Sequence, residues 1–230
     1  DACEKLLALI KGKNADCIVC GLKQTSGNIW APAFDKDYSD LASFKCDFIY
    51  WINTELLSSS VNKIYKRGLI TELYPENMSF GEDLVFVLNY LKHCNRISFT
   101  QEPLYQHEVY NSVSLTHSFS PARFSNLEDI QKAILDFADD KNKINPRIYD
   151  KYVKDALHLT RMWYKNKNVP YIRKKEIIGE WLKQSYIRKL KISDYQLHWK
   201  DRMLLHCLHM SCFIGINLIV NGKEYINSLS

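Results

Sequence analysis

Residues 60–114 read SVNKIYKRGLITELYPENMSFGEDLVFVLNYLKHCNRISFTQEPLYQHEVYNSVS, and this stretch decides how the rest of the chain is interpreted. At its centre two adjacent carboxylates, Glu82 and Asp83, precede a segment in which apolar residues recur at helical spacing. This recurrence predicts a helix with one buried face. The residues of that face are Leu84, Val87, Leu88 and Leu91.

The two acids stand at the predicted start of this helix. Ser79 and Glu82 have the spacing of a capping box, with Ser79 as the N-cap and Glu82 reaching back to the free amides. Asp83 then lies in the first turn, where the helix dipole favours the ionised carboxylate. An ionised carboxylate can accept a proton from a hydroxyl group. The alternative is that both acids only stabilise the helix start.

Four further motifs surround this helix in a fixed order: VNKIYKR (residues 61–67), RISFT (96–100), EPLY (102–105) and NSVS (111–114). Together with the acidic pair they resemble the second half of family 2 glycosyltransferases, which are inverting enzymes of the GT-A fold. The resemblance extends from residue 1 to about residue 118 and is faint beyond it.

The resemblance implies an α/β fold with two regions. Residues 1–118 are expected to form the acceptor-side half of a Rossmann-like GT-A mixed sheet with flanking helices, and residues 119–230 a basic, all-helical C-terminal region. In the family, the segment similar to residues 1–22 follows a D-x-D motif that holds Mg²⁺ or Mn²⁺ and the nucleotide diphosphate. We therefore expect this chain to lack the N-terminal nucleotide-binding half, to contain no metal ligand and to be inactive by itself.

The resemblance also implies an activity and a set of site residues. Such enzymes pass a sugar from a nucleotide donor, typically UDP-linked, to a hydroxyl of a glycan or lipid-linked acceptor in bacterial cell-surface polysaccharide biosynthesis. Asp83 matches the catalytic base of the family, and Glu82 stands beside it. The residues expected to shape the acceptor pocket are Asn62, Lys63 and Tyr65.

Two positions depart from the family pattern. A tryptophan commonly precedes the Asn-Lys pair, but this chain has Val61, so an aromatic stacking surface for the acceptor is expected to be missing there. Where the family often has Tyr-Arg, this chain has His107 and Glu108. His107 is a candidate ligand for a phosphate or metal at the substrate, although a single histidine in a strand is more often structural.

Composition and charge limit the function classes. The 230 residues are 46% hydrophobic and 25% charged, which is typical of a soluble globular protein. The net charge of +5 permits a nucleotide-sugar or an anionic lipid surface as partner but is too small to indicate nucleic acid. Seven cysteines and no visible signal peptide favour reduced thiols and a cytoplasmic location.

Two short motifs are expected to carry no chemistry. Cys17 and Cys20 have the spacing of a redox pair, but residues three apart in a strand point to opposite faces of the sheet. Asp35 and Asp37 form a D-x-D with no preceding buried strand, and we expect a solvated turn there.

The remaining N-terminal elements follow from hydrophobic patterns. Residues 1–13 are expected to form a helix with Leu6, Leu7, Leu9 and Ile10 facing inward. Residues 15–22 are expected to form a buried strand, and residues 61–66, 96–100 and 104–110 shorter strands of the same sheet. Residues 40–57 are expected to form a helix whose aromatic stripe is Phe44, Phe48, Tyr50 and Trp51.

The C-terminal region combines helical periodicity with positive charge. Residues 165–202 contain eleven Lys and Arg against four Asp and Glu, a local net charge of +7, which predicts peripheral contact with anionic membranes on their cytoplasmic face. The apolar run of residues 203–220 is expected to be a core helix, with a surface-lying membrane helix and a membrane span as alternatives. A zinc site among His206, Cys207, His209 and Cys212 is not favoured, because Cys207 would point away from the face of the two histidines.

A second hypothesis comes from a different functional class. The chain would be a non-catalytic docking or membrane-association module, with its helical region carried by a degenerate transferase remnant.

Overall fold

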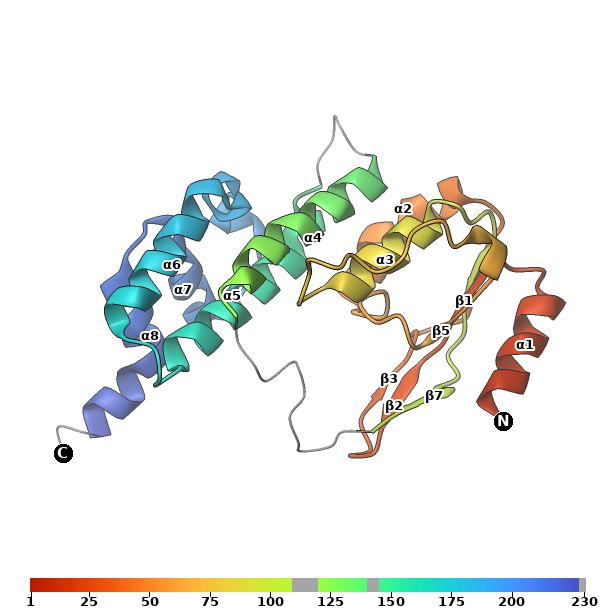
Figure 1. Ribbon diagram of the computed structural model, residues 1–230, viewed down its shortest axis with the longest axis horizontal. Coiled ribbons are helices and arrows are strands. Elements are labelled where there is room, and N and C mark those ends of the chain that lie inside the picture. Colours follow the sequence, from red (N-terminus) through yellow and green to blue (C-terminus); the bar gives the residue numbers. More distant parts are fainter. Residues whose placement is uncertain (109–119, 140–144, 228–230) are drawn as a thin grey trace. The chain divides into compact units, whose positions relative to one another are not determined.

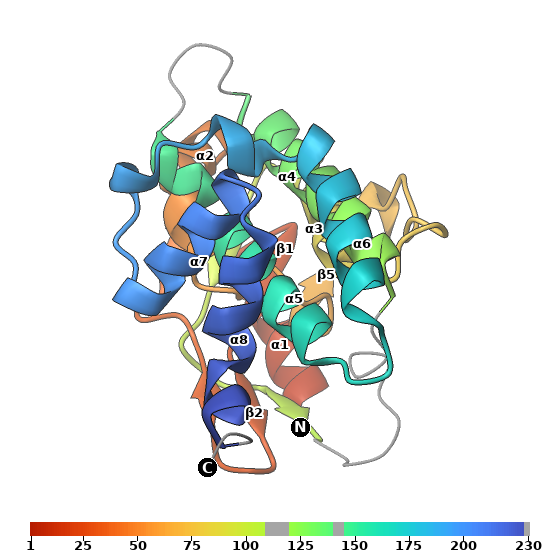
Figure 2. The same ribbon diagram turned by 90° about the vertical axis from the view of Figure 1, so that its left-hand side faces the viewer.

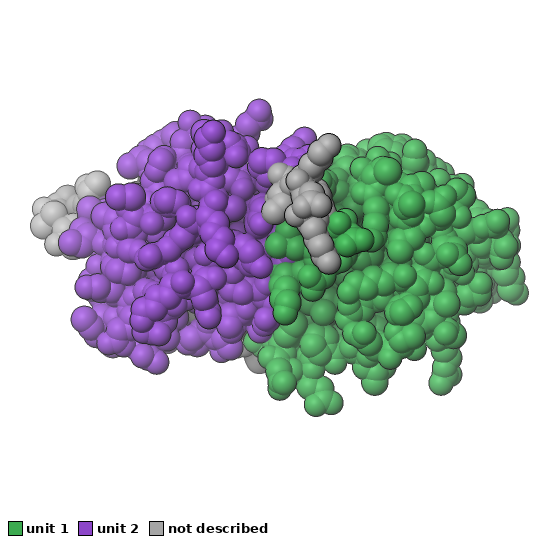
Figure 3. Space-filling view, turned by 90° about the horizontal axis from the view of Figure 1, so that it is seen from above, with its two compact units in different colours: residues 1–117, 132–142 green, residues 118–131, 143–230 purple. Residues whose placement is uncertain are grey.

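The computed structural model describes residues 1–108, 120–139 and 145–227, with the side chains of residues 223–227 excepted. The chain divides into two compact units (Figure 3). Unit 1 comprises residues 1–117 and 132–142, and unit 2 comprises residues 118–131 and 143–230. Helix α4 (Ala122–Ala138) contributes its start to unit 2 and its last turns to unit 1.

Unit 1 combines helices with short strands, as its resemblance implied. Its elements in chain order are α1 (Ala2–Gly12), β1 (Cys17–Val19), β2 (Leu22–Gln24), β3 (Ile29–Trp30), β4 (Lys36–Tyr38), α2 (Leu41–Asn53), β5 (Lys63–Tyr65), the 3-10 turn η1 (Arg67–Leu69), α3 (Glu82–Leu91), β6 (Ile97–Phe99) and β7 (Tyr105–His107).

The main sheet of unit 1 is mixed, with strand order β4-β6-β1-β5. Strand β1 runs parallel to β6 and antiparallel to β5. All three residues of β1 are buried, which requires that both faces of the sheet be covered. Helices α2 and α3 lie against one face and α1 lies against the other (Figure 1). The predicted buried strand and mixed sheet are therefore confirmed.

Aromatic rings fill the space between α2 and the main sheet. The rings of Trp51 and Phe99 stack at a centroid distance of 3.7 Å, and Phe44 lies 6.1 Å from Phe99. Phe48 contacts Phe137, from the end of α4, at 4.7 Å. Each such ring pair stabilises the fold by about 1 kcal/mol beyond the contribution from burying its apolar surface. The aromatic stripe predicted for this helix is thus its packing face.

Two side chains expected to face inward are exposed instead. Leu7 of α1 is 47% exposed, because α1 packs on the sheet through the half-buried Leu6, Leu9 and Ile10 on its other side. Tyr50 of α2 is 43% exposed and stacks on Phe34 at 5.8 Å.

A second, three-stranded sheet of order β3-β2-β7 lies beside the main one in unit 1 (Figure 1). The expectation that residues 104–110 close the main sheet is therefore wrong, because β7 pairs with β2 instead. The expected turn at Asp35 and Asp37 is also wrong, since residues 36–38 form β4 at the edge of the main sheet. Charged residues are common on edge strands, where one side meets solvent.

Helix α3 begins later than the capping box requires. Its first residue is Glu82, and its N-cap is Gly81, which has φ 78° and makes no side-chain cap hydrogen bond. The capping-box prediction for Ser79 and Glu82 is therefore wrong, because the left-handed conformation of Gly81 turns the chain into the helix two residues further on. Asp83 remains in the first turn, and the predicted apolar face is buried as expected.

Unit 2 is entirely helical in its described part, which confirms the helical C-terminal region. Besides the start of α4 it contains η3 (Pro146–Tyr149), α5 (Asp150–Lys165), α6 (Tyr171–Gln184), η4 (Tyr186–Lys189), η5 (Ile192–Asp194), α7 (Trp199–His209) and α8 (Phe213–Asn227). Figure 2 shows α7 and α8 side by side, and α5 packs against α6, α7 and α8.

The long apolar run of unit 2 is two helices and not one. Helix α7 ends at His209 and α8 starts at Phe213, with Ser211 at φ 54° between them. A Cβ atom at Gly215 would lie 2.6 Å from Cys207 Sγ, so glycine permits α8 to fold back closely on α7. Within residues 1–108, 120–139 and 145–227, no helix is both long and apolar enough to cross a membrane.

Candidate functional site

A cavity of about 270 Å³ lies in unit 1 between the three-stranded sheet and the chain that follows α2. Strand pairing explains its sheet side. Leu22 is opposite Trp30, and Gln24 is opposite His107, so these four residues share one face of the sheet. The other lining residues are Thr54, Glu55, Leu56, Ser59 and Asn62.

The wall formed by residues 54–59 is held by the Asn-Lys pair of the VNKIYKR motif. Asn62 Nδ2 donates to the backbone oxygens of Cys20 (2.9 Å) and Leu56 (3.3 Å). Lys63 Nζ donates to the backbone oxygen of Leu56 (2.8 Å), to that of Ser59 and to Asn62 Oδ1 (2.8 Å). The N–H groups of these two side chains therefore fix the shape of the loop and are already engaged when a ligand binds.

Lys63 carries its charge in a buried position. Burial lowers the pKa of its ammonium to about 8, and the Asp83 carboxylate is one of the negative groups that oppose this shift. The three acceptors around Nζ match the three N–H donors of the protonated form. At pH 7 the side chain is thus charged and fully hydrogen-bonded, as a clamp on the loop.

The carboxylate of Asp83 is positioned by the same segment. Ser60 Oγ donates to Asp83 Oδ1 at 2.8 Å, and Tyr65 Oη donates to the backbone oxygen of Ser60 at 2.8 Å. Burial raises the pKa of Tyr65, so its hydroxyl keeps its proton and remains a donor. Glu82 is half-buried and makes no hydrogen bond or ion pair with the part of the chain that the structure describes.

The predicted site residues therefore fall into two groups. Asn62 and His107 line the cavity, whereas Lys63, Tyr65 and Asp83 do not. Asp83 is connected to the cavity through Ser60, which follows the lining residue Ser59 in the chain. The motif NSVS at residues 111–114 lies outside the described residues.

The described residues do not fit a divalent metal. None of the groups of His, Cys, Asp and Glu in residues 1–108, 120–139 and 145–227 brings three potential ligands together. Asp37 forms an ion pair with Lys13 (2.7 Å), and Asp35 accepts the backbone N–H of Gln101 (2.7 Å). Cys17 is buried with a free thiol, and burial raises its pKa to about 12.

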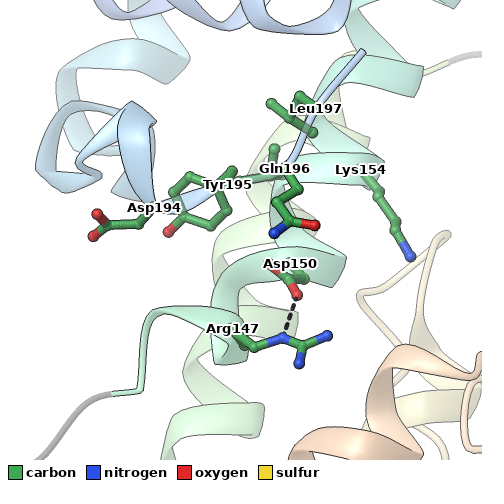
Figure 4. Close-up of a pocket in the computed structure, with 8 residues that line it drawn as sticks. Arg147, Asp150, Lys154, Asp194, Tyr195, Gln196 and Leu197 are labelled. Atoms are coloured by element: carbon green, nitrogen blue, oxygen red, sulfur yellow. Dashed lines mark hydrogen bonds and ion pairs between the residues drawn. The ribbon is translucent and has the colours of Figure 1, made fainter.

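A larger cavity, of about 370 Å³, lies in unit 2 (Figure 4). It contains none of the candidate residues. Among its charged groups, Arg147 Nε forms an ion pair with Asp150 Oδ2 at 3.5 Å. The candidate residues and the cavity volume thus point to different cavities, and the smaller cavity contains the candidates Asn62 and His107.

No family model and no curated protein sequence matches this chain. Solved structures of the S. aureus glycosyltransferase TarS are similar to it in fold. TarS 1-349 in complex with UDP-GlcNAc aligns with a TM-score of 0.61 and 17% identity, over 97% of this chain and 63% of TarS 1-349. This chain has a glycosyltransferase-like fold. A second structure of TarS 1-349 gives a TM-score of 0.58 and 14% identity, over 96% of this chain and 62% of that structure.

This chain thus spans less than two thirds of the length of either TarS structure.

The sequence analysis did not predict several residues that line the unit 1 cavity, chiefly Gln24, Trp30 and Glu55. A signal for them exists, because the residues 25–28 are Thr-Ser-Gly-Asn, a run typical of a hairpin turn. That hairpin would have placed Trp30 beside Leu22.

Proposed function

We propose that this chain is the acceptor-side part of a glycosyltransferase that passes a sugar from a UDP-linked donor to a hydroxyl of a glycan or lipid-linked acceptor, with inversion. One observation carries the proposal: the Asp83 carboxylate, in the first turn of α3, is held by Ser60 next to a cavity wall that Asn62 and Lys63 keep rigid. The likeness to TarS, solved with UDP-GlcNAc, supports the donor class.

In this mechanism Asp83 removes the proton of the acceptor hydroxyl as the oxygen attacks the anomeric carbon from the side opposite the diphosphate. The Ser60 hydroxyl orients the carboxylate through its hydrogen bond to Asp83 Oδ1. By resemblance, Mg²⁺ or Mn²⁺ would stabilise the departing diphosphate. No described residue of this chain fits such an ion, so none is assigned to it.

The test compares the two acids in the full-length protein. Asp83→Asn keeps the shape of the side chain but removes the proton acceptor, and the transfer rate should fall by roughly 10²-fold or more. Folding should persist. Glu82→Gln is the matched control and should stay active. The rate of UDP release from a panel of UDP-sugars, together with the thermal midpoint, measures both effects.

Two outcomes contradict this assignment. An active Asp83→Asn variant beside a folded but inactive Glu82→Gln variant makes Glu82 the base. If both variants lose stability alone, the acids merely support the helix start and the enzymatic proposal falls.

By itself, the present chain should not bind UDP with Mn²⁺ at micromolar concentration in calorimetry, since its described residues form no metal site.

A second proposal concerns unit 2: cytoplasmic, peripheral contact with an anionic membrane. Large apolar side chains are exposed along α7 and α8, next to basic ones. Lys200 lies over the ring of Trp199, and Lys175 over that of Phe213. The exposed apolar residues are Trp199, Met203, Met210, Ile214 and Leu218.

Flotation with vesicles tests this contact. Vesicles of phosphatidylglycerol and phosphatidylcholine should bind the chain, and binding should fall as salt rises, because each Lys or Arg near the surface contributes about 1 kcal/mol that salt screens. Equal binding to pure phosphatidylcholine, or no binding at all, contradicts the proposal.

A further inference from the structure

The hydrogen-bonding side chains around the unit 1 cavity are not all engaged. Asn62 uses its amide on the loop, but Ser59 Oγ and the His107 ring bond to no residue within the described ranges. Gln24 Oε1 accepts from Ser26 Oγ at 3.2 Å, which leaves its amide nitrogen without an acceptor there. Three polar groups thus line one cavity with hydrogen-bonding capacity to spare.

An aromatic surface faces the same cavity. Trp30 is 43% exposed, and strand pairing places it on the same sheet face as Gln24 and His107. Leu22 and Leu56 add apolar contacts to the lining. The weakly positive C–H groups of a sugar ring are attracted to the negative face of an indole, while its hydroxyls need partners of both hydrogen-bonding types.

Backbone strain marks the rim of the cavity. Glu55 has φ 64°, a left-handed conformation that is uncommon for a residue other than glycine, and it lines the cavity. The turn is maintained by Ser58, which donates through Oγ to Glu55 Oε2 (2.9 Å) and through its backbone N–H to the oxygen of Glu55 (3.0 Å). Such strain persists where the surrounding structure enforces it, and it is concentrated at ligand sites.

We propose that this cavity binds a single pyranose ring stacked on Trp30, with Gln24, Ser59 and His107 as hydrogen-bonding partners. The inference rests in part on the proposed function, since the ring could belong to the acceptor or to the donor sugar. A volume of about 270 Å³ is at the small end of the range for ligand pockets, which begins at ~300 Å³, and suits a single ring. Trp30 then supplies, from another strand, the stacking surface that Val61 does not.

The distribution of tryptophans provides a direct probe. Trp30 and Trp199 are 43% and 59% exposed, whereas Trp51, Trp163 and Trp181 are buried. In a Trp199→Phe background, acrylamide quenching of fluorescence therefore reports on Trp30. Methyl glycosides of glucose and N-acetylglucosamine should protect Trp30 from quenching in a saturable way. With Trp30→Phe and Trp199 intact, the same sugars should protect nothing.

Variants measure how much the ring contributes. In ligand-detected NMR titrations, Trp30→Ala should raise the dissociation constant of the glycoside by roughly tenfold, the factor expected for loss of one aromatic contact. Trp199→Ala, the matched control on unit 2, should leave it unchanged. Equal effects of the two variants, or no protection of Trp30 by glycosides, overturn the proposal.

Separate arms with UDP and UDP-GlcNAc distinguish the two sources of the ring. Protection by glycosides and not by UDP supports an acceptor sugar, and protection by UDP-GlcNAc at much lower concentration supports the donor sugar. Protection by UDP alone overturns the proposal. If glycosides protect Trp30 but the full-length protein transfers no sugar, the carbohydrate site stands and the proposed enzymatic function fails.

Discussion

In unit 1 the Lys63 ammonium holds a loop at the edge of a cavity, whereas in unit 2 the Glu128 carboxylate joins three helices. Glu128 Oε1, on α4, accepts from Tyr152 Oη of α5 (2.6 Å) and from Trp181 Nε1 of α6 (2.7 Å). Glu128 Oε2 accepts the backbone N–H of Tyr186 at 3.2 Å. Both ionisable groups are surrounded by hydrogen-bonding partners, but Lys63 lies beside a cavity whose lining includes Gln24, Ser59 and His107.

This difference separates two uses of a charge away from solvent. The donors to Glu128 come from α5, α6 and the start of η4, so the network specifies how these elements pack against α4. Around Lys63 two of the three acceptors are backbone oxygens of a loop, so the same kind of bonding holds the wall of a cavity. We expect substitutions in unit 2 to change stability, and substitutions around the unit 1 cavity to change binding and rate.

The largest effect on stability is expected for Glu128→Ala. It leaves the Tyr152 hydroxyl and the Trp181 N–H without their acceptor, while the Tyr186 amide keeps only Tyr152 Oη, and the free energy of unfolding should fall by about 4 kcal/mol. Glu128→Gln, the matched control, keeps one acceptor oxygen and should cost about 1 kcal/mol. Urea denaturation followed by circular dichroism measures both. Equal losses in the two variants would mean that the hydrogen bonds do not matter.

The buried Lys63 ammonium should make the free energy of unfolding depend on pH. Its pKa is lower in the folded chain, about 8, than the usual 10.5, so above pH 8 the unfolded chain binds more protons and stability rises with pH. Between pH 8 and 10.5 the wild type should gain about 3 kcal/mol relative to Lys63→Met, at 1.36 kcal/mol per pKa unit. Parallel stability curves for the two proteins would show that Lys63 is not held as described.

Ser60→Ala tests the link between the loop and the carboxylate. It removes the hydrogen bond to Asp83 Oδ1 but keeps the backbone oxygen that accepts from Tyr65. The transfer rate of the full-length protein should fall by roughly tenfold, since a hydrogen bond to a carboxylate is worth about 1.5 kcal/mol. Ser43→Ala, which removes a bond in α2, is the control. A similar rate for both variants would contradict the positioning role.

The smallest effect is expected for Glu82→Gln. Glu82 is the first residue of α3 and closes no capping box, so only its favourable charge near the helix start is lost. The free energy of unfolding should change by about 0.5 kcal/mol, as for other charges near a helix terminus. Thermal unfolding at low and high salt measures this, and the difference should shrink as salt rises. A loss above 2 kcal/mol would instead support a capping box between Ser79 and Glu82.

Sequence alone was sufficient for the helices α2 and α3 and for the position of Asp83. The apolar spacing of α3 and the aromatic spacing of α2 depend only on the helical repeat, which each segment carries by itself. Asp83 lies in the first helical turn whether the cap is Ser79 or Gly81, so the error in the capping box did not move it far.

The tertiary structure decided what the site residues do. The VNKIYKR motif shows that Asn62 and Lys63 stand together, but not that their polar atoms are taken up by the backbone of residues 20, 56 and 59. Likewise, nothing near Trp30 in the sequence connects it with His107, since β2 brings them onto one sheet face only through pairing on both of its sides. The bond from Asn62 to Cys20 and the pairing of β2 with β7 join residues far apart in the chain. Such long-range contacts follow from the whole fold and not from any local repeat.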